Sequence, residues 1–353
     1  MKAVVWHGRG DVRVEEVAYA PSPGPGEVRV AVEWCGICGT DLEERRSGPH
    51  FVPLDPHPLT GRMAPLVLGH EVAGRVADLG DEVEGLEEGD LIGLDALIGC
   101  GQCWYCQRHQ INLCRKLAAI GLMADGGLSE AVTVPAAMCI PIPAAVKGDS
   151  AALAEPVAVA VRGLRRGRAA LGDSVAILGA GMIGLATLCA ARACGASQIL
   201  VADPLEERRS LALSLGADAA LDPTTGEFLQ VTRDRTEGRG VDIAVDAAGS
   251  ALSGPQAIEA TRPGGRTVIV GLSSTPAIVD LFALAGSEKE VLGSLSHIAD
   301  EDFVAAVRLL ASGVLTAERI GAVKVPLESA VTDGFDVFER PNAPVKILVG
   351  SQA

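Results

Sequence analysis

The feature that most constrains the fold is an apolar run at residues 174–178 that leads directly into Gly179-Ala180-Gly181-Met182-Ile183-Gly184. An alanine-rich stretch follows and ends at Gly195. Between a strand and a helix, the first glycine permits a tight turn, the second lets the backbone approach a pyrophosphate, and the third allows close packing. The free N–H groups at the helix N-terminus then bind phosphate. This segment predicts a parallel α/β domain that binds a dinucleotide.

Strands and helices are expected to alternate through the rest of this domain, with strands at residues 198–203, 241–247 and 266–271. The alternation predicts a doubly wound parallel sheet of the Rossmann type. The second strand ends at Asp203, nineteen residues after Gly184. Its carboxylate would bind the adenosine ribose diol and repel a 2′-phosphate, which favours NAD over NADP. The alternative is that the glycines serve only a tight turn. The expected cofactor-binding residues are Gly179, Gly181, Met182, Ile183, Gly184, Asp203 and Arg208.

Short valine-rich runs broken by glycine and proline dominate residues 1–155, for example residues 28–32 and 71–76. This pattern is typical of a compact, mainly β domain. We therefore predict an α/β protein with a mainly β domain at residues 1–155 and the nucleotide-binding domain at residues 156–296. Residues 297–353 should return to the first domain, with a helix at 301–312 and an edge strand at 345–349.

Four of the nine cysteines, Cys100, Cys103, Cys106 and Cys114, fall in one short lobe at about residues 95–115. Disulfide bonds are not expected, because the chain shows no export signal. Four thiolates complete a tetrahedral shell around Zn²⁺ and leave no position for a substrate, which predicts a structural zinc site. Four cysteines can also hold an iron–sulfur cluster, but nothing nearby indicates electron transfer.

A second, dispersed set of metal donors consists of Cys38, within Cys35-Gly36-Ile37-Cys38-Gly39-Thr40-Asp41, and the adjacent His70 and Glu71. A thiolate, an imidazole and a carboxylate supply three zinc ligands and leave a fourth position open, as catalysis requires. From these residues alone, a core cysteine and a loop histidine explain the pattern equally well. The cysteines outside both sets are expected to be small buried residues: Cys35, Cys139, Cys189 and Cys194.

The order and spacing of these motifs closely resemble the zinc-containing medium-chain dehydrogenase/reductase family over essentially the whole chain. Gly69-His70-Glu71-Val72-Ala73-Gly74 matches the family's zinc signature, and residues 34–42 and 56–61 are most similar to the 2,3-butanediol dehydrogenases, then to sorbitol and threonine dehydrogenases. The resemblance implies a GroES-like catalytic domain, two zinc ions per chain, and NAD-linked interconversion of a small secondary alcohol or vicinal diol with its ketone. The implied ligands of the catalytic zinc are Cys38, His70, Glu71 and Glu155, the last as a ligand or a neighbouring base.

The resemblance also implies a route for the substrate proton. Thr40, two residues after Cys38, would take the proton of the alcohol through its hydroxyl. Family members usually carry a histidine at the position of Glu43 that helps to pass the proton to solvent. Three explanations stay open: Glu43 accepts the proton itself, a cofactor ribose hydroxyl releases it directly to water, or the enzyme has changed its substrate or lost rate.

Family position gives weaker expectations for the substrate pocket. Phe51, Ile120, Leu122 and Leu295 would line it, although each is equally compatible with a place in the core. His50 and His57 lie in a proline-rich loop and are interpreted as loop polar groups.

Charge and hydropathy exclude some classes of function. The formal net charge of −15 argues against nucleic-acid binding, and no apolar run is long enough to span a bilayer. We expect a cytoplasmic protein that binds a small alcohol or ketone and, by resemblance, forms a homodimer or homotetramer. The rival hypotheses are a polyol or amino-alcohol dehydrogenase, a zinc-free quinone reductase, which both ligand sets disfavour, and a non-catalytic, zinc-stabilised NAD sensor or scaffold.

Overall fold

The computed structural model describes residues 1–351, which divide into two compact units. The first unit contains Met1–Glu155 together with the chain from Ile298 onward, and the second contains Pro156–His297. Helix α3 (Ala154–Arg166) connects them in sequence.

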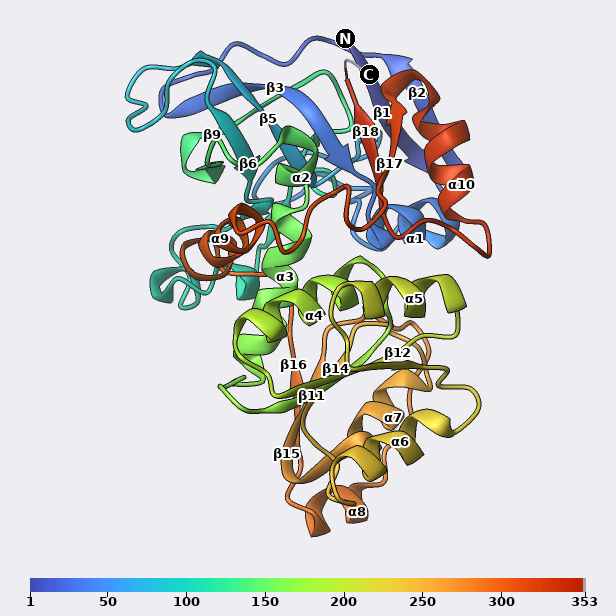
Figure 1. Ribbon diagram of the computed structural model, residues 1–353. Helices are drawn as coiled ribbons and strands as arrows, with labels where there is room; N and C mark the ends of the chain where they lie inside the picture. The colour runs from blue at the N-terminus through green and yellow to red at the C-terminus, as the bar shows by residue number, and fades with distance from the viewer. Residues whose placement is uncertain (352–353) are drawn as a thin grey trace. The chain divides into compact units, whose positions relative to one another are not determined.

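The first unit is mainly β, as its valine-rich alternation predicts. Its strands are β1 (Lys2–Gly8), β2 (Asp11–Glu16), β3 (Glu27–Gly36), β4 (Leu66–Val67), β5 (Glu71–Leu79), β6 (Leu91–Leu94), β7 (Leu97–Ile98), β8 (Ala118–Ala119), β9 (Ala131–Pro135), β10 (Cys139–Pro141), β17 (Val323–Pro326) and β18 (Ile347–Gly350). The main sheet has the order β10-β6-β5-β3-β18-β17, with β9 also paired to β3 (Figure 1). Along β3, fully buried residues alternate with partly exposed ones, because one face of the strand packs on the core.

Short helices complete this unit. They are α1 (Gly39–Ser47), α2 (Gly148–Ala151), α9 (Val304–Ala311) and α10 (Asp336–Phe338), with 3₁₀ turns at Cys106–Arg108, Ile111–Leu113, Ala136–Met138 and Leu327–Ser329, and π turns at Ala299–Phe303 and Ala330–Phe335. The helix predicted at 301–312 is therefore α9 preceded by a π turn.

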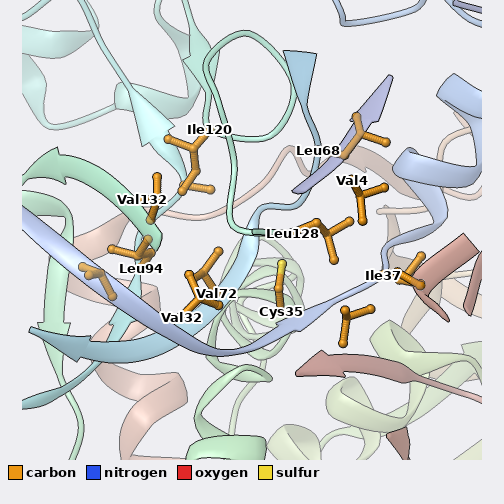
Figure 2. Close-up of a cluster of buried hydrophobic side chains, with 14 of the residues drawn as sticks. Val4, Val32, Cys35, Ile37, Leu68, Val72, Leu94, Ile120, Leu128 and Val132 are labelled. Atoms are coloured by element: carbon orange, nitrogen blue, oxygen red, sulfur yellow. The ribbon is translucent and has the colours of Figure 1, made fainter. Parts of the chain in front are cut away.

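The hydrophobic core of the first unit holds the end of β3 in place. Figure 2 shows Cys35 and Ile37 among aliphatic side chains that include Leu128 and Val72. Cys35 and Ile37 are completely buried, and burying an isoleucine side chain stabilises a fold by about 1.5–3 kcal/mol. The residue that follows, Cys38, is thus presented from a rigid support.

The C-terminal strand corrects one prediction. The chain does return to the first unit, but β18 is not an edge strand, because it pairs antiparallel with β3 on one side and parallel with β17 on the other. The edge position belongs to β17. The apolar run at 347–349 signalled this internal position, since every residue of β18 is buried.

The second unit is the predicted doubly wound parallel sheet. Its order, β13-β12-β11-β14-β15-β16, places the first three strands in reverse and the next three in sequence. Helices α4 and α5 cover one face, and α6 and α7 cover the other (Figure 1). The bounds are β11 (Ser174–Leu178), α4 (Met182–Ala193), β12 (Gln198–Ala202), α5 (Glu206–Ser214), β13 (Ala219–Leu221), α6 (Glu227–Arg235), β14 (Val241–Asp246), α7 (Ser253–Ala260), β15 (Thr261–Ile269), α8 (Leu281–Gly286) and β16 (Glu290–Gly293).

The expectation that the remaining cysteines are buried holds for three of them. Cys35, Cys139 and Cys189 are buried, whereas Cys194 is exposed. Cys194 is the residue that caps the C-terminus of α4, where the helix ends at the surface.

Candidate functional site

Cys38, His70 and Glu71 converge because β3 and β5 pair antiparallel with Gly36 opposite Glu71. Cys38 follows β3 as the N-cap of α1, and Glu71 begins β5 directly after His70. Gly36 is needed here, since a Cβ at this position would clash with Glu71 Oε2. The ligand atoms of the three side chains lie within 4.8 Å of one another.

Anionic groups surround the His70 imidazole. Burial lowers the pKa of His70, but Asp41, Cys38 and Glu155 raise it more, so the pKa lies well above its usual value. Burial raises the pKa of Asp41 to about 6. Asp41 Oδ1 lies 3.7 Å from His70 Nδ1, and neither atom has a hydrogen-bond partner among residues 1–351. Leaving buried polar atoms without hydrogen-bond partners destabilises a folded protein. Such unpaired atoms are expected at a site that binds a cation in its functional state.

Lys346 is a positively charged side chain buried at this site, and the sequence did not reveal its role. Its ammonium donates to Glu71 Oε1 at 2.8 Å, to Glu71 Oε2 at 2.6 Å and to the Ile37 carbonyl at 3.0 Å. Burial lowers the pKa of Lys346, but Glu71, Cys38 and Glu155 together raise it by more. The pKa therefore lies above its usual value, and the lysine stays charged. The lone lysine before the buried run of β18 was the available signal, because a buried ammonium needs an anionic partner.

The donor set fits a zinc ion. Zinc bonds to sulfur at about 2.3 Å and to nitrogen or oxygen at about 2.0–2.2 Å, so tetrahedral ligands lie about 3–4 Å apart. Cys38, His70 and Glu71 meet the spacing and the chemistry of three such ligands. Glu155, at the start of α3, is buried and acts electrostatically on His70, but it is outside this group of three among the described residues.

The four-cysteine lobe is also compact. The Sγ distances are 3.5 Å for Cys103–Cys106, 3.9 Å for Cys103–Cys114 and 4.0 Å for Cys100–Cys106. A tetrahedral zinc–thiolate shell has S···S edges of about 3.8 Å, and a disulfide bond is far shorter, at about 2.0 Å. The backbone N–H of Cys106 is the main group that lowers the pKa of Cys103, to about 6. The lobe fits a closed structural metal site.

The glycine-rich turn in the second unit has the geometry of a phosphate cradle. A Cβ on Gly184 would clash with the Gly179 carbonyl, whereas Gly181 is open, with only the Arg208 guanidinium at 4.0 Å from such a Cβ. Arg208 Nε is buried and has no hydrogen-bond partner among the described residues. Asp203 is buried at the end of β12, and its Oδ2 accepts from Ala180 N at 2.8 Å. The turn, a cation and the acidic residue therefore meet at one end of the sheet.

Comparison with known proteins identifies the family of the chain. Residues 24–144 match the family model described as an alcohol dehydrogenase GroES-like domain, and residues 183–312 match the zinc-binding dehydrogenase model. An (R,R)-butanediol dehydrogenase of Bacillus subtilis is 34% identical over 352 residues, which cover 99% of both chains.

The chain belongs to the zinc-containing medium-chain dehydrogenases. It is an oxidoreductase of the zinc-dependent alcohol dehydrogenase class with a GroES-like domain and a Rossmann domain, as predicted. The crystal structure of the 2R,3R-butanediol dehydrogenase from Bacillus subtilis superimposes with a TM-score of 0.91 at 34% identity, covering 99% of both chains.

Two further relatives show the range of the family. An L-threonine 3-dehydrogenase of Pyrococcus furiosus is 34% identical over 91% of this chain and 88% of its own. A zinc-binding dehydrogenase from Sinorhizobium meliloti, whose crystal structure is described as bound to NADP, has 33% identity and a TM-score of 0.87, covering 99% of this chain and 98% of its own. The family therefore includes several substrates and more than one form of the cofactor.

The side chains expected to line the substrate pocket have different environments. Ile120 is 2% exposed and belongs to the core of the first unit, where Figure 2 shows it, and Leu122 is also buried. Phe51 is 37% exposed and Leu295, in the second unit, is 46% exposed. For Ile120 the structure favours the core alternative. Within residues 1–351, no helix of this dehydrogenase is long and apolar enough to cross a membrane.

Proposed function

We propose that this dehydrogenase oxidises a small secondary alcohol, first a vicinal diol of the 2,3-butanediol type, to the ketone with NAD⁺, and catalyses the reverse reaction. The observation that carries the proposal is the convergence of Cys38, His70 and Glu71 within 4.8 Å, since three ligands leave a metal position open for substrate. The butanediol dehydrogenase relative that matches almost the whole chain supports the diol as substrate.

Cys38, His70 and Glu71 would hold the catalytic zinc, with Glu155 beside the open position as a ligand or base. Zinc at this position supplies a Lewis acid that lowers the pKa of a bound alcohol. Thr40 would accept the alcohol proton through its hydroxyl, whose oxygen lies 3.7 Å from Cys38 Sγ. The four cysteines of the lobe would hold a second, structural zinc, giving two zinc ions per chain.

The cofactor would bind at the glycine-rich turn, with the residues from Gly179 to Gly184 around its pyrophosphate. Asp203, at the end of β12, supports NAD because a carboxylate repels a 2′-phosphate. Arg208 would neutralise the pyrophosphate, and its unpaired Nε is consistent with that role. Because a relative binds NADP, the preference needs direct comparison of both cofactors.

A homodimer is the proposed assembly, through the β16 edge of the parallel sheet. Ile278 and Phe282 are each 90% exposed, Leu281 71% and Leu272 67%. These exposed apolar side chains precede β16 in sequence, and β16 is the edge of its sheet. Exposed apolar residues and an edge strand both favour association, and a standard interface needs about 800 Å² per partner. Light scattering on Phe282→Glu tests this proposal: the variant should be monomeric, and an unchanged mass would exclude this surface.

The decisive experiment measures bound zinc and reduced-cofactor formation for NAD and NADP across vicinal diols, polyols, L-threonine and simple secondary alcohols. About two zinc ions per chain and the highest kcat/KM with 2,3-butanediol and NAD are expected. A higher kcat/KM with sorbitol or L-threonine would replace the diol with that substrate class. Cys38→Ala should abolish turnover and retain the metal of the cysteine lobe.

A further inference from the structure

Glu43 occupies the position where the family usually has a histidine, and it shares a face of α1 with two hydroxyl side chains. Thr40, Glu43 and Ser47 follow one another at intervals of three and four residues, so they lie on one side of the helix. Thr40 begins this row beside Cys38, at 3.7 Å between Oγ1 and Sγ. The row therefore leads from the metal donors toward the C-terminus of α1.

Ser47 joins Glu43 to a histidine from the following loop. Ser47 Oγ lies 3.3 Å from Glu43 Oε2 and 2.7 Å from His50 Nε2. Ser47 Oγ also lies 3.2 Å from the Glu43 carbonyl oxygen, which competes for the one hydroxyl proton. The path is continuous when Glu43 is protonated, because Glu43 then donates to Ser47 while Ser47 donates to His50. The Glu43 side chain is 53% exposed and His50 is also exposed, so the path ends in water.

The position of His50 is fixed by a buried carboxylate. Glu44 is completely buried, and its Oε1 and Oε2 accept from the backbone N–H of His50 at 2.9 and 3.1 Å. The Glu44 carboxylate also accepts from Phe51 N, and the backbone carbonyl of Glu44 accepts from Gly48 N at 3.0 Å. These bonds tie the loop to the end of α1, so the contact between Ser47 and His50 does not depend on an unanchored segment.

The two carboxylate oxygens of Glu43 have different partners, and Oε2 is the one that faces Ser47. Arg46 Nη1 lies 3.0 Å from Glu43 Oε1, the other oxygen, in an exposed ion pair. Glu44 faces the backbone of His50. Among the charged side chains of α1, Glu44 thus binds the His50 backbone directly and Glu43 reaches the imidazole through Ser47.

We infer that Glu43, Ser47 and His50 form a proton relay that replaces the single relay histidine of the family; this inference depends on the proposed alcohol dehydrogenase activity. A proton that reaches Glu43 leaves its Oε2 for Ser47 Oγ as the Ser47 hydroxyl proton moves to His50 Nε2. His50 then releases a proton from Nδ1 to water, which leaves the Nε2–H tautomer. Proton exchange of this exposed imidazole with water restores the Nδ1–H tautomer, and rotation of the Ser47 hydroxyl restores its bond to His50 Nε2. Residues three apart on a helix have Cβ atoms about 5–6 Å apart, so one hydroxyl or water between them would be needed to carry the proton from Thr40 to Glu43.

The reason for the longer path is the basicity of its last member. A solvated carboxylate is a weak base near neutral pH, whereas an imidazole changes its charge in that range. His50 therefore restores the basic group that the glutamate lacks. Of the two histidines in the proline-rich loop, His57 has a different role, since its Nδ1 accepts from Leu59 N at 3.3 Å within its own turn.

The test is the pH dependence of kcat for His50→Gln, with His57→Gln as the matched control. His50→Gln should lower kcat at pH 7 by about tenfold or more, because proton transfer by a positioned base contributes at least about 10²-fold. The loss should shrink at pH 9, and added imidazole should restore much of the rate, whereas His57→Gln should match the wild type. A wild-type pH profile for His50→Gln, or a loss that imidazole leaves unchanged, would overturn the relay.

A second measurement is independent of turnover. In ¹⁵N-labelled enzyme, Ser47→Ala and Glu43→Gln should both shift the tautomer ratio of His50, because Ser47 Oγ contacts its Nε2, and no shift in either variant would contradict the path. If the enzyme oxidises another alcohol, the proposed substrate fails while the same pH profiles on that alcohol still decide the relay. Glu43→His together with Ser47→Ala should recover the rate by the shorter route.

Discussion

Replacing Lys346 with methionine should destabilise the metal-free first unit strongly. Lys346 is 2% exposed and Glu71 is 1% exposed, and the ammonium contacts both carboxylate oxygens and the Ile37 carbonyl. Methionine keeps the volume and removes the charge, which leaves a buried carboxylate without its counterion. Breaking a buried pair in this way costs about 3–5 kcal/mol. For a unit of this size, 1 kcal/mol corresponds to about 2–4 °C, so Tm should fall by roughly 10 °C.

Calorimetry of the metal-free and zinc-loaded forms tests this reasoning. Zinc neutralises Glu71 as well, so the loss on Lys346→Met should be less than half as large in the loaded protein. Glu71→Gln in the same chain should recover part of the metal-free loss. Lys324→Met is the matched control, because its pair with Asp149 is partly exposed and should contribute at most about 1 kcal/mol. A metal-free Lys346→Met protein that melts within 2 °C of the wild type, on the ~10 °C scale expected above, would refute the argument.

Three other predictions concern the remaining sites. Cys103→Ala should lower bound zinc by about one ion per chain and lower Tm, as measured by metal analysis and calorimetry; full retention of both contradicts a structural zinc. Gly184→Ala should destabilise the second unit, because the new Cβ would clash with the Gly179 carbonyl. Gly181→Ala should fold normally, because Gly181 lies in open space at a φ of −74°. This second variant should bind NAD at least about tenfold more weakly, because its Cβ keeps the backbone away from the pyrophosphate. Equal stability of the two variants would contradict the packing role of Gly184, and unchanged NAD affinity of Gly181→Ala would contradict the phosphate-binding role of the turn. Asp203→Ser with Pro204→Arg should shift kcat/KM toward NADP, and unchanged selectivity removes Asp203 from that role.

The predictable parts of this protein are those in which the chemistry is local in sequence. The strand and glycine turn at residues 174–184 needed only their own spacing, because the tight turn, phosphate approach and helix packing all occur within one strand–helix connection. The four cysteines of the lobe were recognisable for the same reason, since Cys100 to Cys114 span only a short segment. Cys38, His70 and Glu71 are farther apart, and from the residues alone they were as compatible with a core as with a metal site.

Tertiary structure decided how the distant residues act on one another. The register of β3 against β5 brings Glu71 opposite Gly36, and the internal position of β18 delivers Lys346 to the same carboxylate. Neither pairing follows from local pattern, because strand order depends on which apolar faces bury each other across the whole unit. Glu44 likewise fixes His50 six residues away through backbone bonds that only a folded loop can form. The sequence by itself determined which donors this dehydrogenase has, and the tertiary structure determined which charges balance them, because a buried charge is defined by neighbours that are distant along the chain.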